Sequence, residues 1–190
     1  MVTMARQMAE GIADLHGFEG GPIVHNDMQY SQFLADESMN LYLSDFNRAD
    51  ILLWDDVDQN YCKEFLGAAG GNVRSPEEYG SQAVEEKIDV YSFGMALYTL
   101  LTGREPYDDL EHGSPGHASV HGLVPEIDIS IRGNSIAEAA ISAVIDKCLV
   151  YDPIDRIDIF DVVKLLREAE SFALHLSQFH SIDDGYNHEH

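Results

Sequence analysis

Basic residues are scarce in this chain. Its 190 residues include 11 Lys and Arg against 34 Asp and Glu, which gives a formal net charge of −23. A surface this acidic repels phosphate backbones and anionic headgroups, so the sequence argues against nucleic acid and anionic membranes as partners. The same charge would attract a basic protein substrate or regulatory partner, although it also serves solubility alone.

Cysteines and long apolar runs are also few. The two cysteines, Cys62 and Cys148, give no spacing typical of a disulfide framework. The longest apolar stretch, Val90–Leu101, is too short to cross a bilayer and favours a buried helix. The first residues lack the pattern of a secretory signal. We therefore expect a cytoplasmic location and no membrane segment in this chain, with an anchor upstream left open.

Helical periodicity covers much of the sequence, whose composition of 45% hydrophobic and 24% charged residues suits one compact domain. Apolar residues at three- and four-residue spacing predict a first helix that ends near Gly17. A nearly all-apolar helix should follow at about 84–101, capped by Gly103. Later helices are expected at about 135–149 and around 159–166, whereas residues 108–132 have the composition of a long loop.

Two acidic loops flank a short apolar hairpin. The segments Gln32–Ala35 and Leu41–Ser44 are β-prone, and the five residues between them are turn-rich, which predicts an antiparallel hairpin. Asp27 precedes the first strand and Asp45 follows the second, so both carboxylates should lie at the same open end with the amide of Gln32 between them. Such oxygen ligands suit a divalent cation that is also bound to phosphates.

These segments resemble the motifs of the protein kinase family, in the family's order. The catalytic-loop motif H-R-D-x-x-x-x-N is followed by D-F-G, by A-P-E, by a buried central helix with its turn, and by a late arginine. The similar segments here are His25–Gln32, Asp45–Asn47, Ser75–Glu77, Asp89–Gly94, Gly103–Tyr107, and Asp152–Pro153 with Arg156.

The resemblance implies a site that uses ATP and Mg²⁺. Asp27 would be the catalytic residue, which accepts the proton of the attacking hydroxyl group. Asp45 would hold the magnesium ion, with Gln32 as a second oxygen ligand to metal and cofactor. Leu34 would lie under the adenine ring. For Asp27 and Asp45, the alternative is an ordinary carboxylate in a turn or helix cap.

Other residues would be architectural by the same resemblance. Asp89 would anchor the backbone of the catalytic loop from inside the central helix. His25 and Phe46 would stack above that helix. Glu77 and Arg156 would form a largely buried ion pair, in which loss of one partner leaves an uncompensated charge.

The chain also departs from the family pattern. Gln32 stands in place of Asn, and Gln29 stands where Ser/Thr kinases have a lysine two residues after the catalytic Asp. No basic residue lies between Asp27 and Asp45, so a positive clamp on the γ-phosphate is missing. Asn26 replaces the arginine that receives an activation-loop phosphate, and residues 45–77 contain no threonine. We expect an activation segment that is not switched by phosphorylation.

The expected fold is mainly α: a kinase-like C-terminal helical lobe at residues 1–172 with a β-hairpin at the catalytic loop, and with the N-terminal β lobe missing. Residues 173–190 are expected to be an acidic, His-containing, disordered tail. The implied function is ATP-dependent phosphoryl transfer to a protein hydroxyl group, on Ser or Thr rather than Tyr. The chain would be only part of the kinase domain and inactive by itself. The alternative is a pseudokinase acting as a binding or regulatory module, which Gln29 and Gln32 favour and the intact Asp27 and Asp45 oppose. An unrelated metal-dependent hydrolase would leave the later motifs unexplained.

Overall fold

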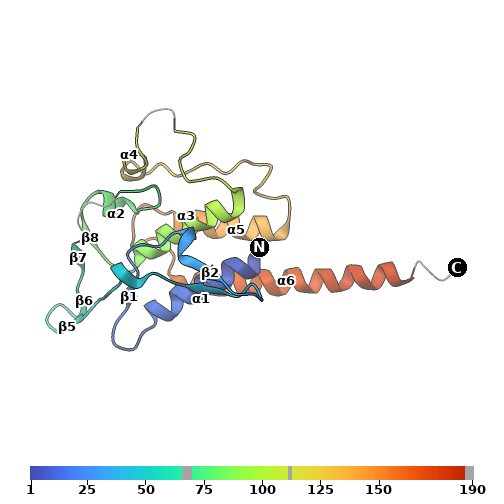
Figure 1. Ribbon diagram of the computed structural model, residues 1–190, viewed down its shortest axis with the longest axis horizontal. Coiled ribbons are helices and arrows are strands. Elements are labelled where there is room, and N and C mark those ends of the chain that lie inside the picture. Colours follow the sequence, from blue (N-terminus) through green and yellow to red (C-terminus); the bar gives the residue numbers. More distant parts are fainter. Residues whose placement is uncertain (66–69, 111–112, 187–190) are drawn as a thin grey trace.

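The computed structural model describes residues 1–65, 70–110 and 113–186, without the side chains of 64, 65 and 177–186. Helices dominate these residues and the strands are short (Figure 1). The helices are α1 (Val2–His16), α2 (Pro76–Tyr79), α3 (Lys87–Thr102), α4 (Pro115–Val120), α5 (Ile136–Cys148) and α6 (Ile159–Tyr186), with 3₁₀ turns η1 (Tyr30–Gln32) and η2 (Phe46–Arg48). The prediction of a mainly helical fold is confirmed.

Helix α3 is the centre of the fold. Twelve of its residues are buried, from Ile88 through Tyr98 and again at Leu101. A helix that is apolar all round can be stable only when other elements cover it on every side. Gly103 ends α3 in the left-handed region (φ 70°), and its N–H donates to the carbonyl of Thr99, as the sequence predicted for this cap.

The other long helices surround this centre. Helix α5 packs on α3, α6 packs on α5, and α1 packs on α6, so the first and last helices lie side by side (Figure 1). Their apolar faces form one core with α3, which includes Ile12, Phe93, Ile141 and Leu166. Close packing of α3 and α5 depends on Gly94, because a Cβ there would lie 2.7 Å from the Cβ of Cys148.

Helix α6 continues beyond the other helices toward the C-terminus (Figure 1). Residues 173–186 are helical, which differs from the disorder expected for 173–190. The stretch after Phe172 contains no proline, and its first glycine is Gly185, so nothing in the sequence interrupts the helix. Residues 187–190 lie outside the described residues, and a domain boundary at residue 172 stays a prediction.

The described strands form two-stranded antiparallel sheets: β1 (Ile23–Val24) with β4 (Asp50–Ile51), β2 (Phe33–Ala35) with β3 (Leu41–Leu43), β5 (Trp54–Asp55) with β6 (Asn60–Tyr61), and β7 (Glu64–Phe65) with β8 (Ala83–Val84). In the β2–β3 hairpin Phe33 lies opposite Leu43. Asp36 closes its turn by accepting hydrogen bonds from the N–H groups of Ser38 and Asn40, both at 2.8 Å. The hairpin rests on α1.

The loop expected at 108–132 contains the short helix α4. Ser114 begins it, because its hydroxyl oxygen accepts the N–H of His117, and Pro115 stands at the first helical position. Helix α4 packs on α2, and Ser119 reaches the backbone of Arg74. A six-residue helix is too short for periodicity to identify.

Candidate active site

The loop after β1 is anchored by a buried residue of α3. Asp89, in the first turn of α3 and 1% exposed, accepts the N–H of His25 at 2.7 Å and the N–H of Asn26 at 3.1 Å. The imidazole of His16 also contacts this carboxylate, at 3.2 Å. Asn26 has a left-handed backbone (φ 62°), a conformation that Asn tolerates better than most residues. Charge-assisted hydrogen bonds to a buried carboxylate therefore fix the backbone just before Asp27.

A second loop, which follows β3, is joined to the first. The Nε2 atom of His25 lies 2.9 Å from the carbonyl oxygen of Ser44. The rings of His25 and Phe46 meet edge to face, with centroids 5.4 Å apart. The side-chain amide of Asn26 donates to the carbonyl of Arg48 at 3.0 Å. These contacts hold together the two loops that carry Asp27 and Asp45.

The hairpin between the loops is closed at its base by Ser44. Both its N–H and its hydroxyl donate to the carbonyl of Gln32, at 2.9 and 2.8 Å. Gln32, which is 7% exposed at the end of η1, is thus beside the residue that precedes Asp45. Leu34, further along β2, is 58% exposed.

The two carboxylates have different surroundings. Asp45 is exposed and left-handed (φ 64°), and it begins η2 without its side chain capping the turn. Asp27 is partly buried and forms an ion pair with Arg74, whose Nη2 lies 2.5 Å from Oδ1 of Asp27. No sequence motif identified Arg74 as a site residue, because it is a lone cation after a glycine-rich stretch. Its position just before Ser75-Pro76 is the signal that could have found it.

The segment after Arg74 is fixed by a capping box. Ser75 begins α2, its hydroxyl oxygen accepts the N–H of Glu78, and the carboxylate of Glu78 accepts the N–H of Ser75 at 2.8 Å. Burial raises the pKa of Glu78 above its ordinary value, because a charged carboxylate is costly in this interior. Arg74 also lies 3.4 Å from Glu78.

Glu77 and Arg156 meet as a two-pronged buried ion pair, with nitrogen–oxygen distances of 2.6 and 3.0 Å. The guanidinium group donates further to the carbonyls of Lys87, Val150 and Tyr151. It also stacks over the ring of Tyr91, 4.9 Å from the centroid. The pair ties the start of α2 to the turn before α6.

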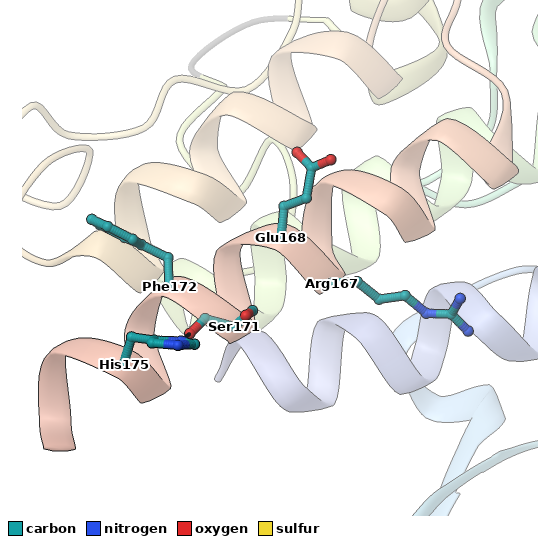
Figure 2. A pocket seen from close by; sticks show the side chains of 5 residues that line it. All are labelled: Arg167, Glu168, Ser171, Phe172 and His175. Carbon is teal, nitrogen blue, oxygen red and sulfur yellow. Dashed lines mark hydrogen bonds between the residues drawn. The ribbon is translucent and has the colours of Figure 1, made fainter.

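An open hollow of about 480 Å³ lies elsewhere, on α6 (Figure 2). Its lining consists of Arg167, Glu168, Ser171, Phe172 and His175. All five side chains come from one helix, so this hollow is a feature of the helix surface and shares no residue with the loops of Asp27 and Asp45.

The family model of the protein kinase domain matches residues 1–165. The chain belongs to the protein kinase family. It is 34% identical over 170 residues to a receptor-like serine/threonine-protein kinase of Arabidopsis thaliana, an alignment that covers 83% of this chain and 47% of the relative.

Other kinases are similar over most of the chain. A probable leucine-rich repeat receptor-like protein kinase of Arabidopsis thaliana is 31% identical over 183 residues, covering 88% of this chain and 16% of that protein. A dual specificity protein kinase of Dictyostelium discoideum is 28% identical over 197 residues, covering 98% and 13%. The chain thus spans less than half the length of these kinases.

Protein kinases generally use ATP and Mg²⁺, and the donor set here fits that use. One carboxylate (Asp45) and one amide (Gln32) suit Mg²⁺ when phosphate oxygens complete its shell. Within residues 1–65, 70–110 and 113–186, no group of three His, Cys, Asp or Glu side chains could hold a metal ion. None of the described helices has the length and apolar character needed to cross a bilayer.

Proposed function

We propose that this chain is the helical lobe of a protein kinase that transfers the γ-phosphoryl group of ATP to a protein hydroxyl, on Ser or Thr rather than Tyr. The observation that carries the proposal is the double anchoring of the catalytic loop. Asp89 holds its backbone, and the contacts of His25 and Asn26 join it to the loop of Asp45. Phosphoryl transfer depends mainly on such positioning and on charge neutralisation.

Each candidate residue has a defined task in this proposal. Asp27 accepts the proton of the substrate hydroxyl. Asp45 and Gln32 hold the magnesium ion, which neutralises charge on the phosphates when bound. Leu34 offers an exposed apolar surface for the adenine ring. Asp89, His25 and Phe46 keep the loops in place, and Glu77 with Arg156 holds α2.

The proposal includes a second lobe. A glycine-rich strand and a strand lysine position the nucleotide phosphates in this family, and the 190 residues contain neither motif. The lobe alone is therefore expected to transfer no phosphate. The proposal also includes a cytoplasmic location and a protein partner. A basic partner would be attracted by the chain's net charge of −23. Two relatives are named receptor-like kinases, so a membrane anchor upstream of this chain stays an alternative within the proposal.

The test is phosphotransfer by the full-length product of the gene. In Mg²⁺ or Mn²⁺ it should phosphorylate a generic basic protein substrate, and Asp27→Asn should lower kcat by about 10²- to 10⁴-fold. Asp155→Asn, the same change at an exposed loop carboxylate, is the matched control and should leave kcat unchanged. Undiminished transfer by Asp27→Asn would refute the role of Asp27.

A pseudokinase that binds a partner without phosphotransfer is the second candidate. Three features favour it: Gln29 and Gln32 replace the usual residues, and the carboxylate of Asp27 is already paired with Arg74. Full-length protein that binds ATP, or a protein partner, and yet transfers no phosphate with any metal would establish this candidate and exclude the first.

A further inference from the structure

Arg74 brings a buried cation into the catalytic loop from a distant part of the chain. It is 6% exposed. Its Nη1 donates to the carbonyl of Asn26 at 2.6 Å, and its Nη2 donates to Oδ1 of Asp27 at 2.5 Å. One guanidinium group therefore holds both the backbone before Asp27 and the carboxylate itself. Among the described residues, no hydrogen bond reaches the other oxygen, Oδ2.

Asp27 is the main charged partner of this arginine. Glu78 is further away, because its Oε1 lies 3.4 Å from Nη1 of Arg74, while its Oε2 accepts hydrogen bonds from the N–H and the hydroxyl of Ser75. Burial also favours the neutral form of Glu78, since it raises the pKa of that carboxyl. The positive charge of Arg74 is thus directed mostly at Asp27.

The hydrogen bonding of Arg74 differs from that of a structural arginine. Arg156 donates from Nε and from both terminal nitrogens to carboxylate and carbonyl oxygens. The Nε of Arg74 is buried and, in the part of the chain that the structure describes, has no hydrogen-bond partner. The hydrogen bonds of Arg74 to the catalytic loop come from its two terminal nitrogens and go to the carbonyl of Asn26 and the carboxylate of Asp27.

The catalytic loop needs a cation that its own sequence does not supply. Residues 28–44 contain no Lys or Arg, and Gln29 stands where the family's Ser/Thr kinases have a lysine. Without a nearby positive charge, Asp27 would face the negative phosphates unshielded. We propose that Arg74 is the positioning residue that supplies this charge from the activation segment and leaves Oδ2 of Asp27 to accept the substrate proton. This inference rests on the proposed phosphotransfer.

The contact of Arg74 with the catalytic loop also requires no phosphate. Asn26 has no positive charge for a phosphate to bind. Arg74, fixed next to the capping box at Ser75, makes the contact between the activation segment and the catalytic loop instead. The orientation of Asp27 thereby depends on a docked activation segment.

The test moves the charge between two positions in the full-length protein. Arg74→Met should lower kcat about 100-fold, with the KM for ATP changed by less than about threefold, because the contact orients the base and does not bind nucleotide. Adding Gln29→Lys should restore kcat by at least about tenfold in the Arg74→Met background. Arg104→Met, at an arginine with a 50% exposed side chain that pairs with Asp108, is the control and should not change kcat.

Three results with the variants would overturn the inference. A folded Arg74→Met protein with wild-type kcat would mean that Arg74 is structural. A loss that Gln29→Lys does not restore would mean the same, because a general defect in folding cannot be repaired by a charge placed two residues after Asp27. A rise in kcat would mean that Arg74 blocks Asp27. If Arg74→Met fails to fold by circular dichroism, Arg74→Gln, which keeps a donor without the charge, is judged by the same criteria. Wild-type protein that transfers no phosphate overturns the proposed function first, and the role of Arg74 with it.

Discussion

Removal of Arg156 should be among the most destabilising single changes in this chain. Its side chain is fully buried, and the side chain of its partner Glu77 is 6% exposed. Arg156→Met would keep the aliphatic volume and remove all five hydrogen bonds of the guanidinium group. The carboxylate of Glu77 would then remain in the interior without a counter-charge.

The expected loss is about 3–5 kcal/mol, the usual consequence of removing one partner of a buried pair. This is a large part of the roughly 5–15 kcal/mol that stabilises a typical domain. Glu77→Gln in the Arg156→Met background removes the unpaired charge as well. The double variant should therefore regain about 1–3 kcal/mol relative to Arg156→Met.

Urea unfolding followed by far-UV circular dichroism measures these differences. Arg104→Met is the matched control, because its ion pair with Asp108 is half exposed and should contribute at most about 1 kcal/mol. The reasoning is refuted if Arg156→Met lies within about 1 kcal/mol of the wild type, or if the double variant is no more stable than Arg156→Met.

Three further predictions concern the interior. Because burial raises the pKa of Glu78, the folded state keeps its proton at pH values where the unfolded chain has lost it. The free energy of unfolding should therefore fall as the pH rises from the ordinary carboxyl range through the raised pKa, by up to about 1.4 kcal/mol per pH unit. In urea unfolding at a series of pH values, Glu78→Gln should lack this fall. Parallel pH profiles of the wild type and Glu78→Gln would contradict the prediction. Gly94→Ala should destabilise by about 1–3 kcal/mol in the same assay, since its Cβ would lie 2.7 Å from the Cβ of Cys148; an unchanged midpoint would mean that α5 moves away. Burial raises the pKa of the Cys148 thiol to about 12. Of the two cysteines, only the exposed Cys62 should therefore react quickly with Ellman's reagent before unfolding. Fast reaction of two thiols per folded chain would contradict the burial of Cys148.

Ordered short motifs and regular periodicity made much of the fold predictable. The spacing of apolar residues identified the helix that became α1, and Gly103 marked the end of α3. Asp89 and the pair of Glu77 with Arg156 could be anticipated only by resemblance, since their partners lie 63 or more positions away in the chain.

The features that sequence reasoning missed have no local signature. The contact of Arg74 with Asp27 spans 47 positions and depends on how two loops are placed in space. The β5–β6 hairpin has strands of two residues, too short for alternation to identify. The continuation of α6 past residue 172 was missed for another reason: polar residues at the end of a chain were interpreted as disorder, although no helix breaker precedes Gly185.

The β5–β6 hairpin has a consequence for how the site could be assembled. Val57 near its tip is 88% exposed, while strand pairs β1–β4 and β7–β8 hold the chain on either side. A cleavage after Val57 would leave Asp27 and α1 on one fragment and Arg74 and α6 on the other. Because α1 packs on α6, the fragments should stay associated, and the pair of Asp27 and Arg74 would become an intermolecular contact. The candidate active site is thus suited to fragment complementation, with neither polypeptide able to form it alone.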